Sequence, residues 1–169
     1  STMKKVHKGA LRILVAVALS LLVSCSSGAK TENEVLITVL KVIDGDTVDI
    51  DINGNTERVR LIGVNTPETK HPTKPIECFG PEASAYLTQL LPKGTTVRIE
   101  RDVEARDRYG RMLLYLYLGS DDLFINLELV ARGYGTPMRI EPNTFHRNEF
   151  VRAAGQAEAA NVGLWKACR

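Results

Sequence analysis

Two aspartates that flank a single glycine are the first residues in this sequence whose types and spacing suggest a binding site. Asp44 and Asp46 lie in the stretch IDGDTVDI, residues 43–50, at a tight connection between two alternating apolar segments. The Asp44-Gly45 pair alone satisfies a hairpin turn, which leaves Asp46 without a role in the turn. A carboxylate at that position is a ligand suited to a hard cation such as Ca²⁺, and this interpretation stands beside that of a plain hairpin turn.

A second oxygen-rich stretch, GVNTPE at residues 63–68, follows a segment that has the alternation of a strand. Turn preferences account for the Asn-Thr-Pro sequence but do not require the carboxylate of Glu68. If the first three strands form a meander, this stretch ends beside the turn between the first two strands. One pocket then receives four oxygen donors: Asp46, the Asn65 amide, the Thr66 carbonyl and Glu68. Such donors bind Ca²⁺ or Mg²⁺, whereas the three histidines are too scattered along the chain to indicate zinc.

Two arginines extend this chemistry from metal binding to phosphate binding. Arg60 lies between Val59 and Leu61, so that strand alternation places it on the face opposite them, and Arg111 opens a later apolar segment. Each arginine taken alone is equally well explained by an ion pair with a nearby acid. Beside a carboxylate and metal pocket, the two guanidinium groups and a free carboxylate match what phosphodiester hydrolysis requires. These requirements are neutralised charge, an activated water and a stabilised leaving oxygen.

The elements that must position these residues follow from the periodicity of apolar residues. Strands are expected at residues 35–43, 47–52, 57–64, 95–103 and 111–118, and helices at 80–91, 126–133 and 144–161. The Asn53-Gly54 pair is a strong hairpin signal, and the connections between the first three strands are too short for the crossovers of a parallel sheet. The order predicts an α+β, mainly β fold, namely a five-stranded Greek-key barrel of the OB type with about three helices.

The N-terminal residues predict export and lipid anchoring. Residues 1–24 combine four basic residues with an apolar run of 11 residues, Ile13–Val23, which suits a signal peptide and is too short to span a membrane. The run ends in LVSC, which resembles the lipobox of bacterial lipoproteins, with Cys25 as the lipidated residue. Ordinary secretion and an uncleaved anchor are the alternatives. We therefore predict a signal peptide at 1–24, a polar tether at 25–34 and one domain at 35–169 that is anchored to a membrane outside the cytoplasm.

Removal of the N-terminal segment changes the charge of the chain. The sequence holds 22 Lys and Arg and 20 Asp and Glu, and four of the basic residues lie within residues 1–24. The remaining chain then carries 18 basic and 20 acidic residues, a formal net charge of −2. Bulk positive charge therefore gives no support for nucleic-acid binding, which must rest on the local placement of charges.

Two cysteines remain after Cys25. Cys78 lies in a mid-chain loop and Cys168 near the end of the sequence. In an oxidising envelope compartment an even pair in loop-like contexts favours a disulfide, with two buried free thiols as the alternative.

Several motifs match one family in the same order and at consistent spacing. IDGDTV (43–48), RLIGVNTPETKHP (60–72), FGPEAS (79–84) and DRYGR (107–111) resemble the staphylococcal nuclease, or thermonuclease, family. The similarity covers roughly residues 35–165. It implies an OB-fold barrel capped by helices and the Ca²⁺-dependent hydrolysis of phosphodiester bonds in DNA and RNA, with Mg²⁺ or Mn²⁺ as alternative metals. We expect a monomer whose partners are its nucleic-acid substrate and the membrane.

The resemblance also implies a role for individual residues. Metal ligands are expected at Asp46, Asn65 and the Thr66 carbonyl, with the acid Asp44 behind them. The catalytic residues are expected to be Glu68, which holds or activates the attacking water, and the phosphate-binding arginines Arg60 and Arg111. Contacts around the substrate phosphate are expected from Lys74, Arg108 and Tyr109.

Apart from the pair Cys78 and Cys168, which the family pattern lacks, this sequence departs from that pattern at two places. The family has an aspartate where this chain has Asn65, so we expect weaker Ca²⁺ binding. The family also stacks a base on tyrosines before the last helix, where this chain has Met138 and Ile140, so that stacking worth about 1–3 kcal/mol is missing or redistributed. The alternative function is a nuclease-like module with little or no catalysis that binds nucleic acid or an envelope partner. A purely structural lipoprotein would leave the acids and arginines unexplained.

Overall fold

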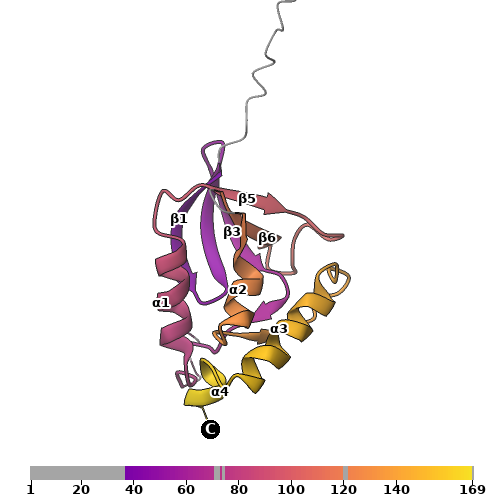
Figure 1. Ribbon diagram of the computed structural model, residues 1–169. Helices are drawn as coiled ribbons and strands as arrows, with labels where there is room; N and C mark the ends of the chain where they lie inside the picture. Colours follow the sequence, from indigo (N-terminus) through magenta and orange to yellow (C-terminus); the bar gives the residue numbers. More distant parts are fainter. Residues whose placement is uncertain (1–36, 71–72, 74, 120–121, 169) are drawn as a thin grey trace, which may run out of the picture. The chain divides into compact units, whose positions relative to one another are not determined.

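The computed structural model describes residues 37–70, 73, 75–119 and 122–168 (Figure 1). The predicted signal peptide at 1–24, the tether at 25–34 with Cys25, and the predicted substrate residue Lys74 lie outside the described residues. No helix in the described part of the chain is long and apolar enough to cross a membrane.

The first three strands form the predicted antiparallel meander. They are β1 (Ile37–Asp44), β2 (Thr47–Ile52) and β3 (Asn55–Leu61), and β2 lies between the other two. Asn53 and Gly54, which connect β2 to β3, have φ values of 54° and 84°. An Asn-Gly pair adopts these left-handed conformations at little cost, which is why it favours a tight hairpin whose twist matches that of the strands. The meander therefore brings the end of β3 beside the turn between β1 and β2.

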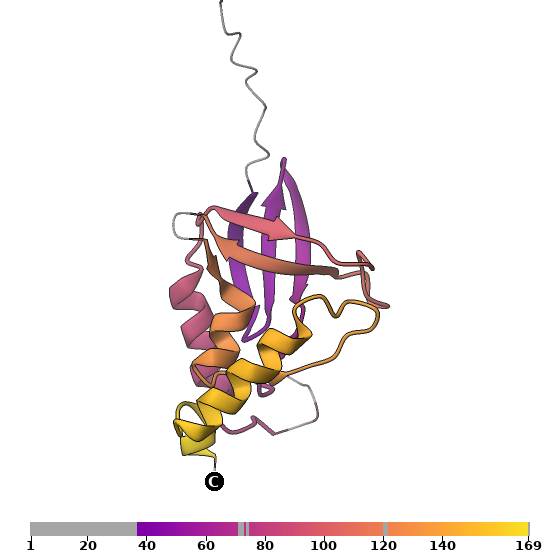
Figure 2. The same cartoon turned by 45° about the vertical axis from the view of Figure 1, so that its right-hand side comes forward.

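The sheet is completed by β5 (Val97–Glu100) and β6 (Met112–Leu118) and then curls on itself. Strand β6 pairs in parallel with β3 and antiparallel with β5. The outer strands meet where Thr38 bridges to Thr96 and the Val39 amide donates to the Thr95 carbonyl at 2.9 Å. Figure 2 shows β5 and β6 crossing the direction of β1 to β3. The predicted α+β fold of the OB type, with its five main strands, is confirmed.

The described residues contain four helices, α1 (Gly80–Leu90), α2 (Ile125–Ala131), α3 (Arg147–Ala159) and the short α4 (Leu164–Ala167), and the first three of them pack against strands. Figures 1 and 2 show α2 between α1 and α3. The core joins apolar residues of the strands to those of the helices, among them Leu61, Leu114, Leu87, Leu129 and Phe150. Burial of these side chains is the main force that holds the helices on the sheet.

Sequence periodicity missed the smallest elements. Strands β4 (Val64–Asn65), β7 (Leu123–Phe124) and β8 (Thr136–Pro137) have two residues each, and α4 has four. A two-residue strand has no period of its own, because it exists only through a partner that is distant in sequence, as when Asn65 pairs with Thr136. The predicted strand 47–52 matches β2, whereas several other predicted strands and helices differ from the observed ends by a few residues; Arg111, for example, lies just before β6.

Asn126 attaches α2 to the strands that carry the candidate site. Its side chain is fully buried, donates to the carbonyls of Ile62 at 2.9 Å and Leu114 at 3.1 Å, and accepts from the Leu116 amide at 2.9 Å. A buried amide is tolerated only when such hydrogen bonds are made. The backbone that leaves β3 is therefore fixed to β6 at Ile62, immediately before the GVNTPE stretch.

The N-terminal end of α3 is attached to the barrel by His146. Its Nδ1 atom lies 2.7 Å from Glu149 Oε1 and its Nε2 atom lies 3.1 Å from Glu100 Oε1. Burial disfavours a charged imidazole, but the hydrogen bonds to Glu149 and Glu100 outweigh burial and raise the pKa of His146. These contacts join β5 to α3, and they give this histidine a structural role away from the acids of the DGD turn.

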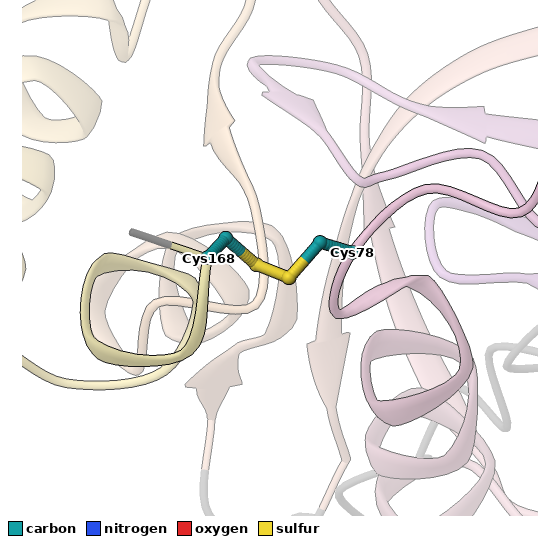
Figure 3. The surroundings of a disulfide bond; sticks show 2 residues. All are labelled: Cys78 and Cys168. Atoms are coloured by element: carbon teal, nitrogen blue, oxygen red, sulfur yellow. A yellow bond between two sulfur atoms is a disulfide. The ribbon is translucent and has the colours of Figure 1, made fainter.

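Cys78 and Cys168 form a disulfide in the structure, with their Cα atoms 5.8 Å apart (Figure 3). The bond connects the segment that leads into α1 with the residue that follows α4, across 90 positions of sequence. It lies close to the residues that carry the predicted chemistry, because Cys78 follows Glu77, which contacts Glu68.

Candidate active site

The DGD turn and the NTPE turn pack directly against each other, as the meander predicts. The Thr66 amide donates to Asp46 Oδ2 at 3.0 Å, and the Leu61 amide donates to the Asp46 carbonyl at 3.0 Å. A Cβ atom at Gly45 would lie 2.5 Å from Thr66 Oγ1, so only glycine permits this approach. The two stretches, which are 20 residues apart in the chain, form one end of the barrel.

Arg60 is buried beneath these turns. Its Nη2 atom lies 3.1 Å from Asp46 Oδ2 and 3.3 Å from Met138 Sδ, and its Nη1 atom donates to the Val64 carbonyl at 2.8 Å. Only 6% of the residue is exposed. The ion pair that an isolated arginine would be expected to form is therefore present, and its partner is the predicted metal ligand Asp46. Strand alternation predicted that the Arg60 side chain lies on the face opposite those of Val59 and Leu61. In the structure all three residues are buried.

The environment of Asp46 disfavours its charge. Burial raises the pKa of its carboxyl group, the Arg60 guanidinium and the Thr66 amide oppose that effect, and the nearby carboxylate of Asp44 adds to it. Asp44 itself accepts a hydrogen bond from the Asp46 amide at 3.1 Å, as a turn residue does. A cation bound at this position would offset the cost of two neighbouring carboxylates.

Arg111 approaches the same site from the start of β6 and is oriented by Asp107. Its Nε atom donates to Asp107 Oδ2 at 2.7 Å, and its amide donates to Asp107 Oδ1 at 2.9 Å. Burial opposes ionisation of Asp107, but the hydrogen bonds from Arg111 and the Tyr109 amide outweigh it and lower the pKa of Asp107. Asp107 is not among the residues predicted from the sequence, although its position four residues before Arg111 in DRYGR is a spacing that permits this pair.

Arg108 and Tyr109 lie in the exposed turn beside Arg111. Tyr109 is 68% exposed, and its hydroxyl oxygen accepts a hydrogen bond from Arg108 Nη2 at 2.6 Å. The guanidinium carbons of Arg108 and Arg111 lie 4.8 Å and 5.5 Å from the centre of its ring. An aromatic ring flanked by two arginines forms an exposed surface that is suited to a phosphate and the sugar or base next to it.

Glu68 is held by the backbone that follows it. Its Oε1 atom accepts hydrogen bonds from the amides of Thr69 at 2.8 Å and Lys70 at 2.7 Å. The side chain is partly exposed and lines a hollow of about 140 Å³, which we call the active-site hollow. Its lining residues are Asp44, Asp46, Thr47, Arg60, Asn65, Thr66, Pro67, Glu68 and Arg111. The structure therefore brings together every predicted metal ligand and all three predicted catalytic residues.

The donors of this hollow fit a hard cation. Asp46, Asn65 and Thr66 offer a carboxylate, an amide and a carbonyl oxygen, and Asp44 adds a second carboxylate nearby. Ca²⁺ and Mg²⁺ prefer oxygen ligands of these kinds. Among the residues that the structure describes, no three or more His, Cys, Asp or Glu side chains are grouped so that they could hold a metal ion by themselves.

Comparison with known proteins agrees with the motifs. Residues 58–167 match the family described as Staphylococcal nuclease homologue. The Thermonuclease of Staphylococcus hyicus is 36% identical over 140 residues, which cover 83% of this chain and 81% of that protein. The Thermonuclease of Staphylococcus intermedius is 35% identical over 170 residues, 97% of this chain and 99% of that protein.

A third relative comes from another genus. The SPbeta prophage-derived endonuclease YokF of Bacillus subtilis is 31% identical over 131 residues, which cover 76% of this chain and 43% of that protein. The family match includes the end of β3, the NTPE turn, the DRYGR segment and all four helices. This chain therefore belongs to the staphylococcal nuclease family.

Proposed function

We propose that this protein is a metal-dependent endonuclease that hydrolyses phosphodiester bonds of DNA and RNA at the cell envelope. The observation that carries the proposal is the convergence of Glu68, Arg60, Arg111 and the oxygen donors of Asp46, Asn65 and Thr66 on one polar hollow. The names of the relatives, thermonuclease and endonuclease, support the reaction class.

The two arginines contribute differently to the binding of the scissile phosphate. Arg111 is partly exposed and oriented by Asp107, so its remaining N–H groups can donate to phosphate oxygens that enter the hollow. Arg60 is buried and paired with Asp46, and supplies positive charge from below. Both charges are in place before the substrate arrives, and such preorganised charge stabilises the developing negative charge of the transition state.

Glu68 is the general base, or the group that orients the attacking water. Its Oε1 atom is occupied by two backbone amides, which fix the carboxylate beside the hollow. A carboxylate held in this way can accept the proton of a water that attacks phosphorus in line with the leaving oxygen. A bound Ca²⁺ held by Asp46, Asn65 and Thr66 would neutralise charge on the phosphate. Tyr109 and Arg108 bind the substrate beside the reacting phosphate.

Replacement of Asn65 by aspartate tests both the activity and the metal site. The wild type is expected to hydrolyse single-stranded DNA and RNA in the presence of Ca²⁺ and to lose activity in chelator. The Ca²⁺ concentration that gives half-maximal activity should be at least about fivefold lower for the aspartate variant than for the wild type. The reason is that one added unit charge at about 4 Å contributes about 1 kcal/mol even at the dielectric constant of water. The measurement is hydrolysis against the concentration of Ca²⁺, Mg²⁺ or Mn²⁺.

Asn55→Asp is the matched control, because Asn55 is exposed at the other end of β3 and gains the same charge. An unchanged Ca²⁺ requirement in Asn65→Asp would show that Asn65 is not a ligand that limits binding. Absence of hydrolysis by the wild type with all three metals would overturn the nuclease proposal. Nucleic-acid binding without hydrolysis would then support the binding module.

The envelope location rests on the sequence of residues 1–25, which carries a basic segment, an apolar run and the LVSC stretch. In a bacterial host the full chain is expected in the membrane fraction, and Cys25→Ser is expected to release it, because the lipid-bearing thiol is removed. Ser26→Ala, which keeps the cysteine, is the control. A Cys25→Ser variant that stays in the membrane fraction as the wild type does would refute lipid anchoring.

A further inference from the structure

Glu77 holds the backbone of Glu68 through two reciprocal hydrogen bonds. The Glu68 amide donates to Glu77 Oε2 at 2.9 Å, and the Glu77 amide donates to the Glu68 carbonyl at 2.9 Å. Regular sheet pairing in this stretch ends at Asn65, three residues before Glu68. The two bonds to Glu77 therefore fix the backbone of Glu68 to the segment that precedes α1, while its carboxylate accepts from the amides of Thr69 and Lys70.

The turn that leads to Glu68 borders a second hollow, on the side of the disulfide. This hollow has a volume of about 320 Å³, and its lining residues are Asn65, Pro67, Glu77, Cys78, Thr136, Leu164 and Cys168. Glu77 and both cysteines of the disulfide therefore lie beside the turn that leads to Glu68.

The Glu77 segment is itself anchored to the body of the domain. Cys78 is bonded to Cys168 after α4 (Figure 3), and the first residue of α4 donates from its amide to the Gly133 carbonyl at 2.8 Å, just beyond α2. Phe79 stacks on Tyr134 with the ring centres 5.4 Å apart. The chain that follows Glu77 is thus fixed by contacts with residues just beyond α2 and α4.

The start of α1 also presses on the same turn. A Cβ atom at Gly80 would lie 2.9 Å from the Pro67 carbonyl oxygen and 3.2 Å from that of Glu68. A backbone approach this close needs a glycine and leaves little room for the turn to shift. Three features therefore act on Glu68 from one side: the Glu77 hydrogen bonds, the disulfide behind them and the close approach of Gly80.

We propose that Glu77 and the Cys78–Cys168 disulfide form a clamp that positions Glu68 for the reaction. The inference rests on the proposed function, because Glu77 and the disulfide position the carboxylate of Glu68, which is proposed to act on the attacking water. Glu77 does not touch the substrate; its carboxylate oxygen receives the Glu68 amide, and the disulfide prevents the Glu77 segment from moving away. Cleavage of the disulfide loosens this support without removing any group from the active-site hollow.

The first test changes Glu77 and leaves the disulfide intact. Glu77→Ala is expected to lower kcat about 10- to 100-fold with little change in KM, the range seen when a group that orients a reacting residue is removed. Glu77→Gln should recover most of kcat, because its amide oxygen can still accept from the Glu68 amide. Glu82→Ala, an exposed acid in the first turn of α1, is the matched control and should leave kcat unchanged.

The second test measures the position of Glu68 without any reaction. Amide hydrogen exchange at Glu68 should become faster in Glu77→Ala, and also in Cys78→Ser/Cys168→Ser or after reduction of the wild type. Assays are made well below the unfolding temperature of each variant, so that a loss of kcat reports position and not unfolding.

The outcomes separate this inference from the proposed function. If the wild type hydrolyses nucleic acid but Glu77→Ala keeps both its kcat and its slow exchange at Glu68, the clamp is overturned. It is also overturned if Glu77→Gln is as impaired as Glu77→Ala. If the wild type is inactive with every metal while exchange at Glu68 still accelerates, the nuclease proposal fails and the clamp remains as a structural finding.

Discussion

Replacing Glu68 by glutamine is expected to lower kcat about 100- to 10,000-fold while the domain remains folded, because removal of a general base costs a factor in this range. The substitution is conservative for the structure. The glutamine carbonyl oxygen can still accept from the amides of Thr69 and Lys70, so the turn keeps the hydrogen bonds that shape it. The negative charge of the side chain is lost, and with it the ability to take a proton.

Rates of hydrolysis at saturating substrate and Ca²⁺ measure this effect, with thermal unfolding as the check on folding. Glu82→Gln is the control, since it removes the same charge from an exposed position on α1. A Glu68→Gln variant that keeps kcat within about threefold of the wild type would be inconsistent with proton transfer to this residue, given the effect expected for a general base.

The second large effect concerns stability and distinguishes the two arginines. Arg60→Met is expected to lower the free energy of unfolding by about 3–5 kcal/mol and to abolish activity. It leaves the buried carboxylate of Asp46 without its counter-charge, and breaking one side of a buried pair has this cost. Arg111→Met should change stability by less than about 1 kcal/mol, because its pair with Asp107 is partly exposed to solvent. Its kcat should still fall about 100- to 1,000-fold.

Urea unfolding of the two variants and of Asp46→Asn/Arg60→Met measures the difference. The double variant has no buried charge left at this position and should recover part of the stability that Arg60→Met loses. If Arg60→Met and Arg111→Met prove equally stable, the buried pair is not the source of the stability at this end of the barrel.

The sequence predicted the juxtaposition of the DGD and NTPE turns because the rule involved is local. Two short hairpin connections determine the directions of three consecutive strands, and the end of the third must then lie beside the first turn. Asp46, Asn65, Thr66 and Glu68 followed from that rule alone. Arg60 and Arg111 were recognised as part of the same chemistry, although their different surroundings were not.

The residues that support the site could not be predicted in this way. Asp107 orients Arg111, and Glu77 holds Glu68 through hydrogen bonds that have no signature in composition or periodicity. Met138 contacts Arg60 from 78 residues away, because the pairing of β4 with β8 carries that loop over the site. Such contacts depend on the positions of the loops, and these positions are determined by the packing of the whole domain.

The sequence by itself determined the fold class, the family and the set of acids and arginines at one end of the barrel. These follow from strand period, turn chemistry and motif order, all of which act over short stretches of chain. The tertiary structure alone decided that Arg60 is a buried partner of Asp46 while Arg111 is partly exposed and paired with Asp107. It also placed the disulfide behind Glu68. The physical reason is that the burial of a side chain depends on the closed barrel and the loops that cover it, and therefore cannot be predicted from any single segment of the sequence.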